Sequence, residues 1–298
     1  MKSKNLRCLF VSVFFLVILL SSSDTFSTVH EVFVRNNFFT PPNMNINVGD
    51  TVKWTWQQGV HTTSCDGSPM TSRPPGAPSW AAAINNSNTT FKYVVTVAGT
   101  YNYRCDFHFN LGMVGSFTAN QPVIAVNIKL SYEGFWNGST NVADTAKVFL
   151  HNSSPPYAVV DSAKKNITSS GIVLISFPNA GTGSYYIDVR HRNALETWSQ
   201  SPVAFTLGSN SNYDFTTAQS QAFGNNMMFK LGRWCFFSGD VNQDGLIDVS
   251  DQSEIDNDVI NVTTGYVNTD LTGDSITDLS DASIADNNAF DFVSVIKP

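Results

Sequence analysis

The stretch "YNYRCDFHFNLGMVGSF", residues 101–117, places three side chains that bind soft metals within nine positions. They are Cys105, His108 and Met113, in the spacing Cys-x2-His-x4-Met. A thiolate and two imidazoles with a weak thioether are the donor set of an electron-transfer copper centre. The stretch therefore predicts a metal-binding loop, and the fold around it has to supply one more histidine.

His61, in "QQGVHTTSC" (57–65), is the natural fourth ligand. It follows the strand pattern "VKWTW" (52–56) and belongs to the same β pattern as the loop. Strands at both ends of a ligand loop would hold the donors rigidly, which suits a site whose geometry changes little between Cu(I) and Cu(II). We predict His61, Cys105, His108 and Met113 as the ligands of one copper ion.

With these four residues in place, residues 31–119 resemble a cupredoxin of the plastocyanin-like, type 1 blue copper group. That family has an upstream histidine followed by Cys-x2-His-x4-Met after a long strand. The resemblance implies a Greek-key β-sandwich, one type 1 copper, one-electron transfer and a redox partner protein that the sequence does not name. Phe107, Phe109 and Leu111 would then surround His108 with apolar surface, as a docking patch that also keeps water from the copper.

The histidine and cysteine counts exclude other copper proteins. A multicopper oxidase needs several more histidines for its trinuclear cluster, and a binuclear electron-transfer site needs a second cysteine in the loop. A copper polysaccharide oxygenase would require cleavage just before His30, where Val29 is a poor signal-peptidase residue. After residue 27 the histidines are His30, His61, His108, His151 and His191.

Three cysteines follow residue 27, an odd number, so at least one is outside any internal disulfide. We expect Cys105 on the metal, with Cys65 and Cys235 either bridged or free. A disulfide between Cys105 and Cys65 is the competing interpretation of the loop.

The first 27 residues have the pattern of a cleavable secretory signal. Lys2, Lys4 and Arg7 precede an apolar run from Cys8 to Leu20, which is short for a bilayer span. A membrane anchor is the alternative. We expect an exported protein, extracellular or periplasmic, with cell-surface attachment as an option and no integral membrane segment after cleavage.

The alternation of apolar and polar residues predicts a mainly β chain. "MNINVGDTVKWTW" (44–56) and "TFKYVVTVAGTYNY" (90–103) alternate with period two. Residues 122–237 show similar strand patterns in "VIAVNIKLSY", "AKVFLHN", "GIVLISF" and "SYYIDVRHR", which predict a second β-sandwich of unknown role. Its aromatic residues could line a sugar-binding face, but core packing is the commoner use, and His151 and His191 have no partner ligands.

From Ser238 onward the composition becomes acidic. This tail holds 13 Asp and Glu against Lys297, a net charge of −12, whereas residues 28–237 carry a net charge of +3. Residues 28–237 therefore provide no basic stripe that would bind nucleic acid. The tail also repeats itself at a spacing of 30 residues, since "DVNQDGLIDVSDQSEIDND" aligns with "DLTGDSITDLSDASIADNN".

Each repeat has oxygen-bearing residues at the spacing of an EF-hand-type calcium loop, with a short helix expected after it. Gly245 stands at the sharp turn of the first loop, whereas Ser275 replaces it in the second. We predict two calcium ions. The ligands are Asp240, Asn242, Asp244, the carbonyl of Leu246, Asp248 and Asp251 in the first loop, and Asp270, Thr272, Asp274, the carbonyl of Ile276, Asp278 and Asp281 in the second.

This pair of loops resembles a dockerin module. The resemblance implies folding with calcium and a cohesin-like partner, but the basic residues that many dockerins carry at the helix end are absent here. A calcium-stiffened module for stability or attachment is the alternative. Without calcium, the concentrated negative charge should repel itself.

We therefore expect four segments: a signal peptide (1–27), a cupredoxin domain (28–121), a β-sandwich (122–237) and a dockerin-like calcium module (238–298). The expected function is one-electron transfer, by a carrier rather than a catalyst. The alternative is an extracellular scaffold, adhesion or carbohydrate-associated binding protein that assembles through the tail.

Overall fold

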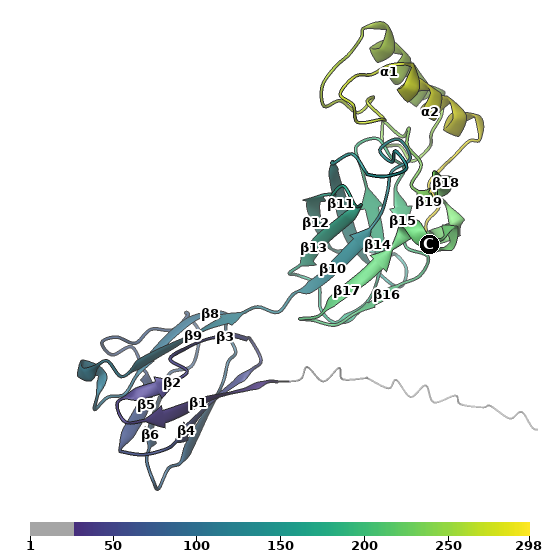
Figure 1. Cartoon of the computed structure of the whole chain (residues 1–298). Helices are drawn as coiled ribbons and strands as arrows, with labels where there is room; N and C mark the ends of the chain where they lie inside the picture. Colours follow the sequence, from purple (N-terminus) through teal and green to yellow (C-terminus); the bar gives the residue numbers. More distant parts are fainter. Residues whose placement is uncertain (1–26) are drawn as a thin grey trace, which may run out of the picture.

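The computed structural model describes residues 27–298, so the expected signal peptide lies outside the described residues except for Ser27. The chain is mainly β, with two helices near its C-terminus, as the sequence predicts. In Figure 1 the strands form two separate bodies joined by a short connection between β9 and β10, and the helices cap the far end of the second body.

The first body is a sandwich of two sheets around one hydrophobic core. The order of one sheet is β2-β1-β4-β7, and the order of the other is β3-β9-β8-β5-β6. β1 pairs in parallel with β4, and β3 with β9. The strands are β1 Val29–Arg35, β2 Phe38–Thr40, β3 Asn43–Asn47, β4 Thr51–Trp56, β5 His61–Cys65, β6 Trp80–Ile84, β7 Thr90–Val94, β8 Gly99–Arg104 and β9 Val114–Asn120.

The core of this body is unusually aromatic, which follows from the alternation in its strands. Trp54, Tyr101, Tyr103 and Phe117 are fully buried, and Trp54 packs edge-on against Tyr103 with ring centroids 5.1 Å apart. Edge-to-face aromatic pairs add to the stabilisation from area burial. This rigid core anchors β5, β8 and β9, which are the strands that carry the predicted metal ligands.

The second body is also a sandwich, with sheets in the orders β13-β10-β17 and β12-β11-β14-β15. β16 pairs with β14, and β18 with β19. The strands are β10 Ile124–Lys129, β11 Thr145–Asn152, β12 Val159–Asn166, β13 Ile172–Phe177, β14 Gly183–Arg190, β15 Thr197–Trp198, β16 Val203–Phe205, β17 Asn210–Asp214, β18 Met228–Lys230 and β19 Arg233–Cys235. Short 3-10 turns lie at Phe109–Leu111 (η1), Phe215–Thr217 (η2), Gln219–Gln221 (η3) and Phe223–Asn225 (η4).

The two helices follow the two acidic loops, as predicted: α1 is Val249–Ile260 and α2 is Leu279–Phe290. Both begin with an aspartate N-cap in a capping box, Asp248 with Asp251 and Asp278 with Asp281. These reciprocal bonds satisfy orphan N–H groups and explain why each helix starts where it does.

The helical tail packs directly on the second sandwich. The Glu133 carboxylate accepts a hydrogen bond from Asn288 Nδ2 at 2.6 Å, and the Asn193 side chain donates to the carbonyl of Asp270 at 2.7 Å. A Cβ at Gly134 would overlap the carbonyl oxygen of Leu271. Leu195 of the sandwich shares a small buried cluster with Ile247 and Ala289 of the tail. The sandwich and the tail therefore share one continuous interface.

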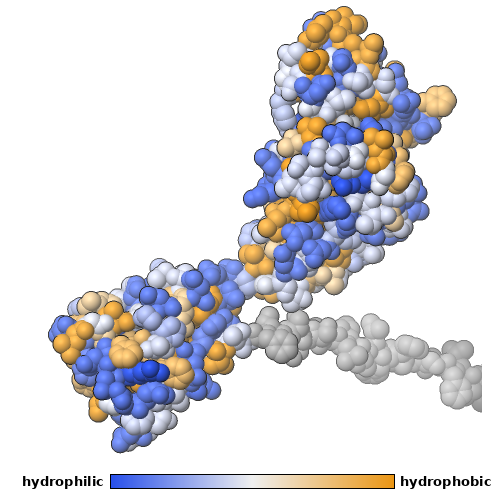
Figure 2. Space-filling model, viewed as in Figure 1, coloured by the Kyte–Doolittle hydropathy of each residue, from blue (hydrophilic) through white to orange (hydrophobic). Residues whose placement is uncertain are grey.

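In the space-filling view of Figure 2 the molecule is elongated, and a narrow neck joins the two bodies. None of the helices in residues 27–298 is long and apolar enough to cross a membrane.

Candidate metal centres

The ligand loop connects β8 to β9 and is closed by its own backbone. Cys105 N donates to the carbonyl of Met113 at 3.0 Å, and Met113 N donates to the carbonyl of His108 at 3.2 Å. Gly112 makes the turn with a φ of 86°, a left-handed conformation that glycine adopts without strain. Cys105 thus lies at the end of β8 and Met113 directly before β9, while His61 enters as the first residue of β5.

Three of the four predicted copper ligands converge. Cys105 Sγ lies 3.5 Å from His108 Nδ1 and 3.8 Å from His61 Nδ1, and the two Nδ1 atoms are 3.2 Å apart. In residues 27–298 this is the one group of three His, Cys, Asp or Glu side chains whose ligand atoms all lie within 4.8 Å of one another. Met113 is fully buried in the same core, held to Cys105 and His108 through backbone hydrogen bonds.

The donor set fits a soft or borderline metal. Burial lowers the pKa of His61, and the neighbouring His108 lowers it further, so the neutral imidazole with a free lone pair is favoured. Two unprotonated Nδ1 atoms facing a sulfur at these distances repel one another unless a proton or a cation lies between them. Gly59 packs against the His61 ring. A Cβ at this position would lie 2.5 Å from His61 Nε2, so a larger residue would displace the imidazole.

A cluster of polar side chains lies beside Cys105. We call it the Asp106 clamp, and it consists of Asp106, Thr62, Ser64 and Arg104. Thr62 N donates to Cys105 Sγ at 3.4 Å. The Asp106 carboxylate accepts hydrogen bonds from the Thr62 hydroxyl at 3.0 Å and the Ser64 hydroxyl at 2.5 Å, and it pairs with Arg104 Nε at 3.0 Å. Outer hydrogen bonds of this kind orient metal ligands and tune the site. Sequence reasoning missed this clamp because its members come from two strands and are ordinary residues one by one.

The apolar residues of the loop have two different environments. Phe107 and Leu111 are 63% and 69% exposed beside the half-buried His108, as a docking patch would require. Phe109 instead lies under the Arg104 guanidinium, 4.2 Å from its ring centroid. The expected apolar surface around His108 therefore consists of Phe107 and Leu111, and the cation covers Phe109.

All three cysteines of the described chain are free and buried, so neither Cys65–Cys235 nor Cys65–Cys105 is bridged. Burial raises the pKa of Cys65 to about 11 and that of Cys235 to about 12. Both remain protonated thiols near neutral pH and are weak metal ligands.

In the first acidic loop, Asp240 is the residue that stands out. Its side chain is buried and its Oδ1 has no hydrogen-bond partner. Burial, followed by the nearby carboxylates of Asp251 and Asp244, raises the pKa of Asp240 to about 7. By contrast, Asp251 accepts hydrogen bonds from the backbone N–H groups of Val241, Asn242 and Asp248.

The side chains of other expected ligands in the first loop accept hydrogen bonds from backbone N–H groups nearby in the chain. Asn242 Oδ1 accepts from Asp244 N, and Asp244 Oδ1 accepts from Leu246 N, each at 2.9 Å. Asp248 caps α1. The carboxylates of this loop do not gather within 4.8 Å of one another as the ligand atoms of His61, Cys105 and His108 do.

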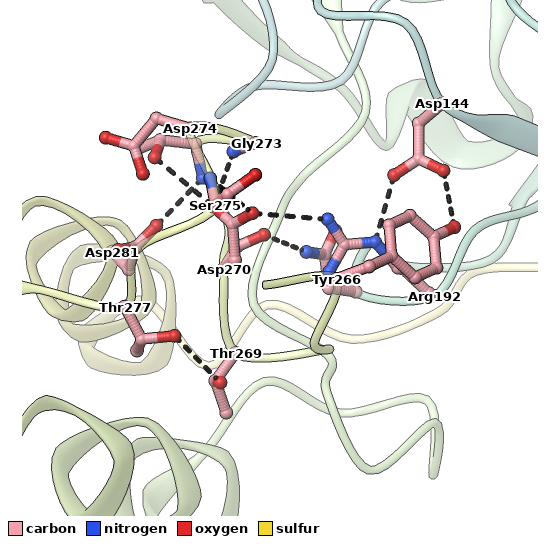
Figure 3. Close-up of polar contacts among 12 residues, drawn as sticks. Asp144, Arg192, Tyr266, Thr269, Asp270, Gly273, Asp274, Ser275, Thr277 and Asp281 are labelled. Atoms are coloured by element: carbon pink, nitrogen blue, oxygen red, sulfur yellow. Dashed lines mark hydrogen bonds and ion pairs between the residues drawn. The ribbon is translucent and has the colours of Figure 1, made fainter. Parts of the chain in front are cut away.

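The second loop differs at its first position, as Figure 3 shows. Asp270 accepts hydrogen bonds from Gly273 N at 2.7 Å and Ser275 N at 3.1 Å, and Arg192 Nη2 lies 3.7 Å from its Oδ2. The equivalent Asp240 has no such cation beside it. Asp281 accepts from Thr272 N and Asp278 N, while Asp274 accepts from Ile276 N.

The histidines of the second sandwich are core residues. His151 Nε2 lies 3.2 Å from Asp188 Oδ2, and His191 Nε2 lies 3.1 Å from Asp144 Oδ2. Both imidazoles are buried, and His191 stacks on Tyr132 with centroids 4.0 Å apart. Trp136 and Trp198, the two tryptophans among the aromatic residues that could have lined a sugar-binding face, are also buried. These residues have structural roles.

Comparison with known proteins gives one family match. Residues 34–120 match the model described as copper binding proteins, plastocyanin/azurin family. No curated protein matches the chain.

Similar solved structures include a pseudoazurin from Sinorhizobium meliloti, at 24% identity over 32% of this chain and 76% of that chain, with a TM-score of 0.27. They also include plastocyanin from Dryopteris crassirhizoma, at 22% identity over 30% of this chain and 100% of that chain, with a TM-score of 0.26. A reduced amicyanin variant is 24% identical over 32% of this chain and 82% of that chain, with a TM-score of 0.25. Scores this low say nothing about activity. The family match alone therefore identifies residues 34–120 as a cupredoxin domain of the plastocyanin/azurin type, and it supports copper binding and electron transfer in general.

Proposed function

We propose that this protein is exported and transfers single electrons through one type 1 copper, held by His61, Cys105, His108 and Met113. The observation that carries the proposal is the convergence of Cys105 Sγ with the Nδ1 atoms of His61 and His108. Bound copper would supply reversible Cu(I)/Cu(II) chemistry, with the thiolate as the strongly coupled ligand. Met113 would supply a weak thioether donor to the copper.

Other residues of the domain would hold the donors in place, exclude water and contact the redox partner. The aromatic core and the Asp106 clamp hold the donors in place, which keeps reorganisation small. Burial of His61, Cys105 and Met113 excludes water. His108 is the half-buried edge through which we expect electrons to pass, with Phe107 and Leu111 as the apolar surface for a redox partner.

The first test is an optical and electron paramagnetic resonance spectrum of the full chain after addition of Cu(II). We expect an intense blue or green thiolate-to-copper band that disappears in Cys105→Ser. The matched controls are Cys65→Ser and Cys235→Ser, which remove buried free thiols outside the site and should retain the band. A colourless protein, or equal loss in all three variants, would contradict the proposal.

We further propose that the two acidic loops bind two calcium ions and that the tail attaches the protein to a partner. Asp240 supports the calcium sites, because a buried carboxylate oxygen without a hydrogen-bond donor is costly unless a cation faces it. The attachment role is supported by apolar residues that the repeat duplicates on the helices. Val249 and Leu279 are 70% and 73% exposed, and Ile260 and Phe290 are 78% and 84% exposed.

Removal of calcium tests the tail. We expect EDTA to lower the melting temperature of the full chain and calcium to restore it, since a ligand at a hundredfold excess over its Kd stabilises the native state by about 2.7 kcal/mol. Asp240→Asn should weaken the response, whereas Asp286→Asn, on the exposed face of α2, should preserve it. A melting temperature indifferent to calcium would refute the calcium proposal. It would leave the copper proposal standing.

The duplicated apolar residues suggest a cohesin-like or other extracellular partner, which would make the protein part of a scaffold. A scaffold component need not cycle between redox states, whereas an electron carrier must. Reversible voltammetry of the copper-loaded chain distinguishes these functions.

A further inference from the structure

A surface pocket of about 280 Å³ lies where β11, β12 and β14 meet the tail. Its lining contains four basic side chains, Lys147, Lys164, Arg190 and Arg192, and no acidic one. This is unexpected in a protein with a net charge of −7, whose tail is its most acidic segment. The pocket is far along the chain from the proposed copper ligands and contains none of the proposed ligands of either metal.

The strand register creates a row of like charges in this pocket. Lys147 of β11 is directly opposite Lys164 of β12 on one side and directly opposite Arg190 of β14 on the other. Residues directly opposite one another in paired strands project from the same face of the sheet, so the three cations lie side by side. Like charges in that arrangement destabilise a sheet.

The counter-charges are unevenly distributed. Arg190 pairs with Asp188 at 2.8 Å and with Glu196 at 3.2 Å. Arg192 pairs with Asp144 at 2.9 Å and lies 3.7 Å from Asp270 (Figure 3). The ion pairs of residues 27–298 provide no carboxylate within 4.0 Å of Lys147 or Lys164. Two positive charges at the pocket are therefore left without a counterion.

Aromatic rings lie beside three of the four cations. The Lys147 ammonium and the Arg190 guanidinium each lie 4.7 Å from the centroid of the Phe149 ring. Arg192 lies 4.4 Å from the centroid of Tyr266, whose hydroxyl donates to Asp144 at 2.6 Å. Cation–π contacts fix the charged groups before a ligand arrives, which lowers the ordering cost of binding.

We propose that this pocket binds an oxyanion, the sulfate, phosphate or carboxylate group of a small ligand, with Lys147 and Lys164 as its principal contacts. The volume is close to the lower limit of small-molecule sites, about 300 Å³, and suits one anionic group with a sugar-sized remainder. Tyr266 and Gln243 of the tail also line the pocket, so its full lining forms only when the tail is folded against the sandwich.

The test is calorimetric titration of the full, calcium-loaded chain at constant ionic strength with sodium sulfate, sodium glucuronate and glucose. We expect sulfate or glucuronate to bind and neutral glucose not to bind. The double variant Lys147→Gln/Lys164→Gln should weaken binding at least about tenfold. Sulfate alone would indicate a free inorganic oxyanion, and tighter binding of glucuronate would indicate an acidic sugar.

Lys165→Gln is the matched control, because it removes the same charge one residue along β12 from an exposed position outside the pocket. It should bind the anion within about twofold of the parent. The double variant should also melt no lower than the parent without anion, since it relieves like-charge repulsion. Absence of binding by both anions, or an equal loss in Lys165→Gln, would overturn the proposal.

Discussion

Asp240 shows how strongly local surroundings change the acidity of one side chain. Its carboxylate is buried among two other carboxylates and its Oδ1 has no donor, so ionisation is unfavourable in the folded chain and the pKa rises to about 7. Asp270, at the same position of the second loop, has two backbone donors and the Arg192 guanidinium nearby. The two loops are alike in sequence but differ in local charge.

The pH dependence of stability without calcium should follow from Asp240. The folded-state pKa of about 7 lies above the ordinary value of 3.8, so the folded chain binds more protons between these values. The contribution of Asp240 to stability should therefore be largest below about pH 4 and fall as pH rises from about 4 to about 7. Thermal melts of the copper-free chain in EDTA at pH 5 and pH 7.5 measure this slope.

Asp240→Asn is the control for that slope, because the amide does not titrate and the fall should flatten. Added calcium should also remove the fall, since the metal favours the ionised carboxylate. A slope that is the same in parent and variant would assign the pH dependence to other groups.

At the scale of elements, the two calcium-type loops differ in how they turn. Gly245 has a φ of 87°, and Ser275 at the equivalent position has a φ of 71°. The left-handed region is strained for a residue with a Cβ, by about 1 kcal/mol. Each loop therefore places one residue with a Cβ in this region at a different position, because the first loop has Gln243 (φ 62°) where the second has Gly273 (φ 75°). The capping boxes that start α1 and α2 are the same.

Exchange of the two turn residues should have opposite effects. Ser275→Gly should stabilise the tail by up to about 1 kcal/mol, because glycine adopts this φ freely. Gly245→Ser should destabilise it by at least as much, since the new Cβ would also lie 3.1 Å from Val295 Cγ1. Urea unfolding in calcium measures both, and changes of the same sign would contradict the explanation from φ.

At the scale of the whole molecule, the second sandwich and the tail are joined by polar and steric contacts. Glu133 and Asn288, Asn193 and Asp270, and Gly134 and Leu271 meet across this interface. The cupredoxin domain instead connects through a narrow neck (Figure 1). Calcium at the tail should therefore stabilise the sandwich and leave the melting of the cupredoxin domain unchanged.

Gly134→Ala tests that coupling. The added methyl group would overlap the Leu271 carbonyl, and overpacking of this kind costs about 1–3 kcal/mol. Calorimetry should show a lower transition for the sandwich with the tail and an unchanged one for the cupredoxin domain. Gly181→Ala is the control, because its Cβ would meet nothing within 4 Å. Equal shifts in both variants would refute a tight interface at Gly134.

Much of the architecture could be predicted from local pattern. Period-two alternation predicts the apolar strands such as β4, β7 and β10, and the two repeated acidic loops predict that a short helix follows each of them. The polar strands β12 and β17 are not recognisable in that way, because they are rich in Lys, Asn and Ser and are paired through their backbones.

By itself, the sequence predicted which kind of metal each loop would bind, because donor chemistry and spacing are local properties: Cys-x2-His-x4-Met with an upstream histidine, and aspartates at regular intervals in two loops. The tertiary structure alone decided the rest. Residues distant along the chain form the Asp106 clamp, the Arg192–Asp270 pair and the row of Lys164, Lys147 and Arg190. Their energies depend on distance and burial, which follow from strand pairing and packing rather than from local spacing.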